Sequence, residues 1–111
     1  RDAQESRGLG DVYKEVTGDF NAVPSDEPIQ VLTNPSDPRH LTHSRTIAGF
    51  TYGPEWTFHD FGKIPYDKRE WIDYIFVKGN IKVLRHGVLT ETLNNLFPSD
   101  HCPVISTLIL E

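Results

Sequence analysis

Residues 71–77, WIDYIFV, decide the fold because they are the most strongly strand-like stretch of the chain. β-Branched and aromatic side chains dominate this stretch, and such residues favour strands. Side chains alternate between the two faces of a strand. One face is therefore expected to carry Trp71, Asp73, Ile75 and Val77, and the other face Ile72, Tyr74 and Phe76.

Further strands are predicted on both sides of this stretch. Residues 78–80, KGN, are typical of a hairpin turn, and residues 81–89, IKVLRHGVL, continue as another strand. Residues 103–110, PVISTLIL, are largely apolar on both faces, so this strand is expected to be buried. Residues 16–20 form a short strand candidate, which follows the tail of a helix that ends near Gly8.

A short helix is predicted after the first strand. Ser25 is the expected N-cap, two acidic residues follow it, and Pro28 is tolerated in the first turn. Ile29 and Leu32, three residues apart, give this helix an inward face. Residues 33–70 are rich in Pro, Gly, Asp and aromatic residues, with a short helix expected within residues 41–50 and a strand near residues 56–58. Loops of this length in small domains are usually functional or mobile.

The composition describes one folded domain and restricts its partners. The 111 residues are 24% charged and 37% hydrophobic, which is typical of a globular chain of one domain. A net charge of −5 disfavours binding of nucleic acid through a basic surface. A bound cation would still allow an acidic chain to act on phosphate esters. No apolar run approaches the roughly 20 residues that span a bilayer.

The cysteine content and the first residue also guide the interpretation. Cys102 is the only cysteine, so neither an intrachain disulfide nor a cysteine metal site is expected. The chain begins at Arg1 and contains no Met, which predicts that it is part of a longer gene product. A signal peptide would lie before Arg1, so the compartment stays open, and a secreted or periplasmic location is compatible with the sequence.

Asp73 is the first candidate site residue, because a carboxylate inside an apolar strand is expensive to bury without a partner. Two interpretations are open. Asp73 could form a structural ion pair with an Arg or Lys, or it could hold a catalytic group in position on the sheet.

Two polar clusters at strand ends offer further candidates. Asp19 and Asn21 in GDFN would point to the same side if the strand continued through Asn21, whereas in an Asx-turn they would only satisfy the backbone. Asp100 and His101 in SDH directly precede the last strand, and they could equally belong to an ordinary turn. Taken together, acid, amide and imidazole groups at three strand ends indicate metal-assisted hydrolysis of a phosphate ester.

Three segments, GDFNAVPSDEPI, WIDYIFV and FPSDHCPVISTLIL, resemble in this order the C-terminal signatures of the endonuclease/exonuclease/phosphatase family. This superfamily includes deoxyribonuclease I, abasic-site endonucleases, neutral sphingomyelinases, inositol-polyphosphate 5-phosphatases and poly(A) deadenylases. The resemblance covers residues 16–110. It is specific for the superfamily and much less so for any one member.

The resemblance implies a role for each matching residue. Asp19 resembles the acid that activates the water nucleophile, and Asn21 resembles the amide that steadies the phosphoryl group. Asp73 resembles the acid that orients the active-site imidazole, which is His101 and lies against the scissile phosphate. Asp100 resembles a carboxylate at the metal centre, which Asp19 is expected to share. Mg²⁺ is the implied ion, and Mn²⁺ could substitute because both accept oxygen ligands.

The pairing of Asp73 with His101 predicts a raised pKa for His101, because a nearby negative charge favours the imidazolium form. The segment at residues 57–61, TFHDF, resembles one found in some bacterial members, so His59 either reaches the substrate phosphate or is an ordinary loop histidine. His40 and His43 are expected to be a solvated pair without a metal, since no third ligand is near. His86 and Cys102 are expected to be structural.

The implied fold is a four-layer α/β/β/α sandwich with mainly antiparallel or mixed sheets, of the deoxyribonuclease I type. Such a domain needs about twice this length, so residues 1–111 are expected to be its C-terminal half, with the N-terminal half as partner. We expect this half alone to bind Mg²⁺ poorly and to have little activity.

The implied function is hydrolysis of a phosphate mono- or diester by in-line attack of an activated water. A small phosphorylated metabolite or a lipid head group is favoured over nucleic acid because of the acidic balance. The alternative is a non-catalytic binding module or an inactive family member.

Overall fold

The computed structural model describes residues 13–111, and the predicted helix near Gly8 lies outside this range. The elements are β1 (Tyr13–Asp19), α1 (Glu27–Leu32), β2 (Thr42–His43), α2 (Ser44–Ile47), β3 (Phe50–Tyr52), the 3₁₀ helix η1 (Tyr66–Lys68), β4 (Asp73–Gly79), β5 (Ile81–Val88) and β6 (Val104–Leu110). They form two three-stranded sheets, ordered β1-β4-β2 and β3-β5-β6. The α/β class with mixed sheets is thereby confirmed.

The first sheet is built around β4, which contains most of residues 71–77. β4 pairs antiparallel with β1, in a register that runs from Tyr13 opposite Gly79 to Asp19 opposite Asp73. The short β2 pairs with the other edge of β4. Because β4 begins at Asp73, the predicted alternation does not reach Trp71, which packs in the same buried cluster as Tyr74. The prediction that Trp71 shares a face with Asp73 was wrong.

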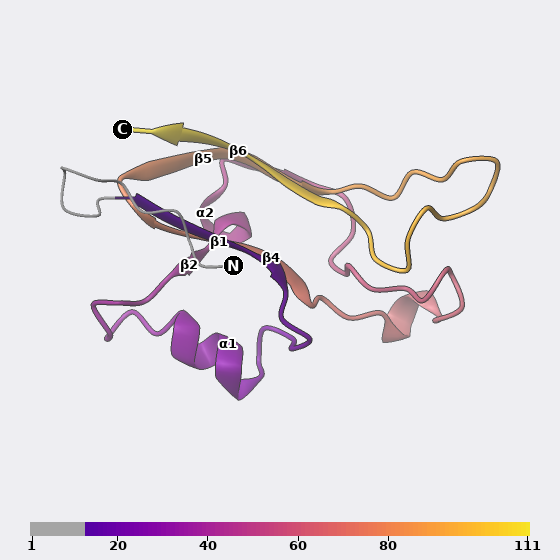
Figure 1. Cartoon of the computed structure of the whole chain (residues 1–111), viewed down its shortest axis with the longest axis horizontal. Coiled ribbons are helices and arrows are strands. Elements are labelled where there is room, and N and C mark those ends of the chain that lie inside the picture. Colours follow the sequence, from indigo (N-terminus) through magenta and orange to yellow (C-terminus); the bar gives the residue numbers. More distant parts are fainter. Residues whose placement is uncertain (1–12) are drawn as a thin grey trace.

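The second sheet corrects the predicted hairpin at residues 78–80. β4 and β5 follow each other in the chain but belong to different sheets. Both edges of β4 are already taken by β1 and β2, so β5 pairs instead with β3, in parallel, and with β6, antiparallel. Gly79, with φ of 103°, turns the chain from one layer to the other. Figure 1 shows β5 and β6 above β1 and β4, with α1 on the far side of the lower sheet.

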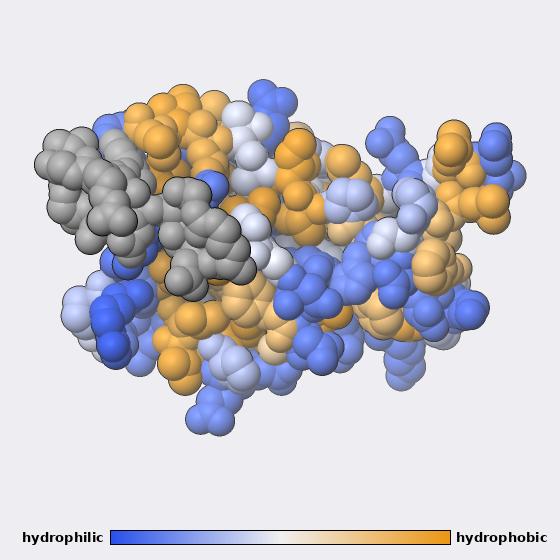
Figure 2. Space-filling model, viewed as in Figure 1, coloured by the Kyte–Doolittle hydropathy of each residue, from blue (hydrophilic) through white to orange (hydrophobic). Residues whose placement is uncertain are grey.

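β6 is far less buried than its apolar sequence predicts. Ile105, Ile109 and Leu110 are exposed by 44%, 45% and 60%. β6 pairs only with β5 among the described residues, so it is an edge strand with one open side. Figure 2 shows hydrophobic atoms gathered at the upper left, over β5 and β6. An apolar area of this kind typically meets a partner surface.

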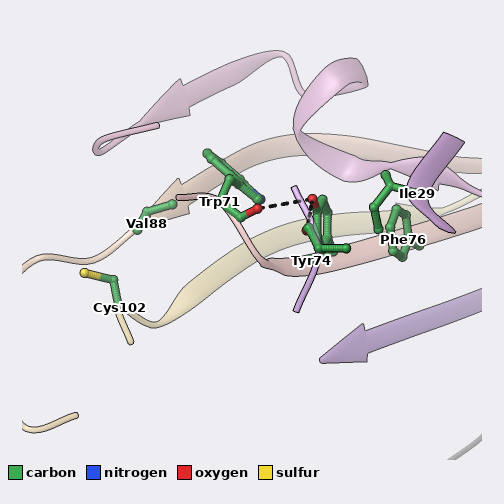
Figure 3. Packing of buried hydrophobic residues seen from close by; sticks show 7 residues of the cluster. Ile29, Trp71, Tyr74, Phe76, Val88 and Cys102 are labelled. Atoms are coloured by element: carbon green, nitrogen blue, oxygen red, sulfur yellow. Dashed lines mark hydrogen bonds between the residues drawn. The ribbon is translucent and has the colours of Figure 1, made fainter. Parts of the chain in front are cut away.

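The buried core centres on aromatic residues of β4. The rings of Tyr74 and Phe76 stack with centroids 5.0 Å apart, and Phe20 meets both rings edge-on. Figure 3 shows the rings of Tyr74 and Phe76 near Ile29 of α1, and α1 covers this face of the sheet. The Tyr74 hydroxyl donates to the carbonyl of Ala22 at 2.7 Å, so the buried phenol is satisfied.

Two local predictions need correction. The N-cap of α1 is Asp26 and not Ser25, and the Asp26 carboxylate accepts a hydrogen bond from the Val23 amide at 2.9 Å. No strand forms at residues 56–58, where Phe58 makes only isolated bridges with Glu70 and His101. These bridges connect the long loop, within residues 33–70, to the segment before β4 and to the segment before β6. No helix within residues 13–111 is long and apolar enough to cross a membrane.

Candidate active site

The three polar motifs meet at one end of the two sheets. The end of β1, the start of β4 and the segment before β6 border a cleft of about 430 Å³. The residues that line it are Thr17, Gly18, Asp19, Asp73, Tyr74, Ile75, Ser99, His101, Cys102, Pro103 and Val104. Residues that lie more than 80 positions apart in the sequence therefore share one site.

The partner of Asp73 is the imidazole of His101. Oδ2 of Asp73 lies 2.7 Å from Nδ1 of His101, and both side chains are mostly buried. The partner that the structure shows for Asp73 is therefore a histidine, and not the Arg or Lys of the first interpretation. The ring is held through Nδ1, which leaves Nε2 as the nitrogen available for other groups.

Two further carboxylates surround the other nitrogen of this ring. Oδ2 of Asp19 lies 3.7 Å from Nε2 of His101, and Oδ1 of Asp100 lies 3.9 Å from it. Asp19 is placed by the sheet, because it stands opposite Asp73 in the register of β1 and β4. The imidazole is therefore enclosed by three acidic side chains.

The pKa of His101 reflects this enclosure. Burial alone lowers the pKa, but the hydrogen bond to Asp73 and the charges of Asp73, Asp100 and Asp19 together raise it above the ordinary value. The direction agrees with the sequence-based prediction. The imidazolium form, which donates hydrogen bonds from both nitrogens, is thus favoured.

Asn21 lies outside the strand that ends at Asp19. Its backbone has φ of 50°, and its amide donates to Oδ1 of Asp19 at 2.8 Å. This geometry is the Asx-turn that was considered as the alternative, so Asp19 and Asn21 do not share a strand face. The Asn21 side chain is exposed at the rim and does not line the cleft.

Thr57 is a positioning residue that the sequence analysis missed. Its side chain is fully buried, and its hydroxyl oxygen accepts hydrogen bonds from the amides of Ile72 at 2.9 Å and Asp73 at 3.2 Å. The amide of Cys102 donates to the Thr57 carbonyl at 2.7 Å. Thr57 thus joins the segments that carry Asp73 and His101. Nothing in the sequence around Thr57 predicts this role, because its hydrogen bonds to residues 72 and 73 form only when the chain folds.

His59 is buried behind the site. Its Nδ1 accepts a hydrogen bond from the Gly62 amide at 3.0 Å, and its ring lies 4.2 Å from that of Phe97. Burial, together with the charge of Arg69, lowers its pKa. The His59 amide donates to the Asp100 carbonyl at 3.0 Å, so this residue anchors the segment that carries the acid. Contact between the His59 ring and a substrate phosphate stays a prediction.

The remaining histidines and the cysteine lie away from the cleft or are buried. His40 Nδ1 lies 2.7 Å from the Asp37 carbonyl. His43 is not solvated as predicted but packs edge-on against Trp71. The structural interpretation of His86 and Cys102 agrees with their burial.

The donor atoms of the site fit a divalent cation. Ligand atoms of Asp19, Asp73 and His101 lie within 4.8 Å of one another. Asp73 and Nδ1 of His101 already bind each other, so Asp19 and the neighbouring Asp100 are the side chains best able to hold an ion. Carboxylate oxygens are the ligands that Mg²⁺ prefers, and Mg²⁺ usually keeps several waters.

Comparison with known proteins agrees with this geometry. Residues 16–101 match the model of the endonuclease/exonuclease/phosphatase family. This match covers most of the chain and includes Asp19, Asn21, Asp73, Asp100 and His101. The chain belongs to the endonuclease/exonuclease/phosphatase family, whose members include phosphatases and nucleases.

Solved structures show the same fold. The endonuclease/exonuclease/phosphatase from Bacteroides vulgatus is 32% identical with a TM-score of 0.83, over 93% of this chain and 38% of that one. A functionally unknown conserved protein from Enterococcus faecalis is 31% identical with a TM-score of 0.76, over 89% of this chain and 37% of that one. The Bacteroides thetaiotaomicron mannosyl-6-phosphatase is 28% identical with a TM-score of 0.76, over 93% of this chain and 39% of that one.

The chain therefore spans about two fifths of the length of the solved structures that it matches. No curated protein matches the chain.

Proposed function

We propose that the protein containing this chain is a divalent-metal-dependent phosphoesterase. The observation that carries the proposal is the arrangement of three carboxylates around His101, with Asp73 on Nδ1 and both Asp19 and Asp100 near Nε2. A binding module would have no need to hold one imidazole in this way. Family membership supports a hydrolase of phosphate esters.

His101 and Asp73 form the first functional unit. Asp73 accepts the Nδ1–H hydrogen bond and favours the positively charged ring. Nε2–H of His101 then donates to an oxygen of the scissile phosphate and stabilises the negative charge that develops there. Asp73 acts through His101 and is a positioning residue.

Asp19 is the proposed base. Its Oδ1 accepts the Asn21 amide, which leaves Oδ2 free on the side of His101. From there Oδ2 takes a proton from the water that attacks phosphorus in line with the leaving oxygen. Asn21, exposed at the rim, donates its side-chain amide to the phosphoryl group.

Asp19 and Asp100 would hold Mg²⁺, with Mn²⁺ as a substitute, together with ligands from the remainder of the protein. A bound Mg²⁺ supplies positive charge that polarises the phosphoryl oxygen. We also propose that residues 1–111 are the C-terminal part of one such domain. The share of about two fifths of the matched structures supports a partial domain, and its place at the C-terminal end rests on the resemblance of the three segments.

A small phosphorylated metabolite is the proposed substrate, with a phosphorylated sugar as the leading class. The net charge of −5 disfavours a grip on polyanionic nucleic acid. One similar structure is a mannosyl-6-phosphatase, which supports a sugar phosphate for this protein as well.

The test is hydrolysis by the full-length protein with Mg²⁺ of a panel of substrates. The panel spans sugar phosphates, bis-p-nitrophenyl phosphate, sphingomyelin, DNA and RNA. We expect metal-dependent turnover that falls by about 10²–10⁴-fold in His101→Ala. His40→Gln serves as the matched control, because this histidine is remote from the cleft. A folded protein with no turnover on any substrate and no Mg²⁺ binding would overturn the proposal.

A further inference from the structure

Phe58 and His101 lie directly opposite each other in an isolated antiparallel bridge. Backbone hydrogen bonds of 2.7 and 3.0 Å join their neighbours, residue 102 to residue 57 and residue 59 to residue 100. When the hydrogen bonds flank an opposed pair in this way, the two side chains stand on the same face and approach closely. The bridge therefore places a phenyl ring beside the candidate catalytic imidazole.

The ring of Phe58 packs against the ring of His101. Their centroids lie 5.0 Å apart and their planes are tilted by 56°, and aromatic pairs prefer offset or tilted arrangements at about 4.5–7 Å. Phe58 is half-buried and does not belong to the buried hydrophobic cluster of residues 13–111. Within this range, the His101 ring is the one aromatic ring that it contacts. The packing of Phe58 therefore serves His101 more directly than it serves the core.

The polar contacts of the imidazole do not fix its orientation by themselves. The hydrogen bond to Asp73 holds Nδ1 at 2.7 Å, but a ring held at one atom can still tilt about that contact. The carboxylates of Asp19 and Asp100 lie 3.7 and 3.9 Å from Nε2, which is too far for a hydrogen bond. A tilt would displace Nε2, the nitrogen assigned to the phosphoryl oxygen. A second ring packed beside the imidazole opposes this tilt, because close-packed rings cannot overlap.

The backbone that carries the Phe58 ring is itself anchored. Side chains alternate along an extended segment, and the two neighbours of Phe58, Thr57 and His59, are both buried. The Phe58 amide donates to the Glu70 carbonyl at 3.1 Å. The ring is therefore presented from a segment that is joined both to the residues before β4 and to those before β6.

We infer that Phe58 is a positioning residue that fixes the tilt of the His101 ring, so that Nε2 faces the substrate phosphate. Asp73 fixes one atom of the imidazole, and Phe58 fixes its plane. The inference rests on the proposed phosphoesterase function and adds to it a residue outside the three polar motifs. Holding a reacting group in one orientation is a large part of enzymatic rate enhancement.

Steady-state kinetics of the full-length protein with Mg²⁺ on a small phosphate ester provide the first test. Phe58→Leu keeps an apolar side chain but loses the flat ring, and we expect kcat to fall about tenfold with little change in KM. Phe58→Tyr keeps the ring and should restore most of kcat. The matched control is Phe50→Leu, which removes a ring of β3 that is 63% exposed and does not line the cleft. This control should leave kcat unchanged.

A double-mutant cycle separates positioning from a general structural role. In a His101→Ala background, Phe58→Leu should change the residual kcat by less than about twofold, because the ring whose tilt it fixes is absent. A residue that only stabilised the fold would lower activity equally in both backgrounds. Melting temperatures close to that of the wild type show that the variants fold, and Phe58→Met takes the place of Phe58→Leu if the latter does not.

The mobility of the His101 ring gives a second readout that needs no turnover. NMR relaxation of isotope-labelled histidine rings measures it in the full-length protein, and the His101 signal is assigned by its absence in His101→Ala. We expect a more mobile ring in Phe58→Leu than in the wild type, in Phe58→Tyr and in Phe50→Leu.

Three outcomes overturn the inference: an unchanged kcat in folded Phe58→Leu, a loss of kcat that is the same with and without His101, or a His101 ring whose mobility does not change. Failure of the proposed function is distinct, because the wild type would then turn over no phosphate ester. The ring mobility would still decide whether Phe58 holds His101.

Discussion

The Oδ2 atom of Asp73 lies 2.7 Å from Nδ1 of His101, although 28 positions separate the two residues in the sequence. β4 supplies the acid and the segment before β6 supplies the imidazole, so the contact joins the two sheets. It also fixes the side of the ring that faces Asp19 and Asp100.

Replacing Asp73 by Asn should remove the negative charge while keeping the shape of the side chain. We expect kcat of the full-length protein to fall by about 10²–10⁴-fold with little change in KM, because the ring loses its charge partner. Steady-state kinetics on a small phosphate ester measure both constants. Glu15→Gln, an exposed acid of β1, is the control. Activity within threefold of wild type in Asp73→Asn would contradict the assigned role.

Thr57→Val should weaken both stability and activity. The variant leaves the amides of Ile72 and Asp73 without their acceptor, which should lower the free energy of unfolding by about 1–3 kcal/mol. Because Asp73 then loses its fixed position, kcat should fall as well. Thr57→Ser keeps the hydroxyl and should restore most of both quantities. A Ser variant that is no better than Val would show that the methyl group, and not the hydroxyl, matters.

Acid should destabilise the fold through two buried histidines. Burial lowers the pKa of His43 and of His86 to about 4, with the charge of Arg45 adding to the effect on both and that of His86 adding to the effect on His43. The unfolded chain binds more protons below its own pKa of roughly 6.5, so stability is complete above that pH. It should then be lost as the pH falls from about 6.5 toward 4.

Chemical denaturation at pH 7.5 and pH 4.5 measures this loss. We expect the free energy of unfolding to fall by on the order of 1–3 kcal/mol for each histidine. His86→Gln should flatten the dependence, whereas His40→Gln should leave it as it is. A pH dependence that is the same in His86→Gln and in wild type would rule out this source.

Gly53 should tolerate no side chain. Its φ is +86°, and a Cβ there would overlap the carbonyl oxygen of Val88 in β5. We expect Gly53→Ala to lower the free energy of unfolding by more than about 2 kcal/mol, because strain and overlap add. In the comparison variant Gly49→Ala, the nearest atom to the Cβ is the Leu84 oxygen at 3.3 Å, so the loss should be smaller. Equal thermal midpoints for both variants would refute the expectation.

Residues 1–111 alone should be nearly inactive. Asp19 and Asp100 offer only part of a metal coordination shell, and the apolar side chains of β6 remain in water. We expect poor Mg²⁺ binding by calorimetry and no measurable turnover, whereas the full-length protein is active. Turnover by the isolated chain comparable to that of the full-length protein would refute the assignment as one part of a domain.

The structural features that depend on a local residue pattern were predicted best from the sequence. Residues 71–77 alternate so strongly that β4 and its aromatic core residues were foreseen, and a carboxylate between Ile72 and Tyr74 had to find a partner. The resemblance to the family then supplied the identity of that partner. The contact between Asp73 and His101 and the raised pKa of His101 agree with what the sequence predicted, while the catalytic role of His101 stays a prediction.

Features that depend on long-range pairing escaped the sequence analysis. Residues 78–80 have turn chemistry, but nothing local shows that both edges of β4 are occupied and that β5 must join another sheet. The apolar pattern of β6 predicts that this strand is buried, but it does not show which surface covers the strand. For Asn21 the strand and the Asx-turn were both open from the sequence, and the φ of 50° together with the hydrogen bond from its amide to Asp19 shows the turn.

The thiol of Cys102 can report on the opening of the cleft. It is the only thiol of the chain, it is buried directly after His101, and its amide is held by Thr57. Burial raises the pKa of the thiol, which keeps it in the unreactive form. A thiol reagent can modify it only when this end of the sandwich opens. The labelling rate of Cys102 therefore measures how often the end of the sheets that carries His101 opens, and the measurement needs no substrate.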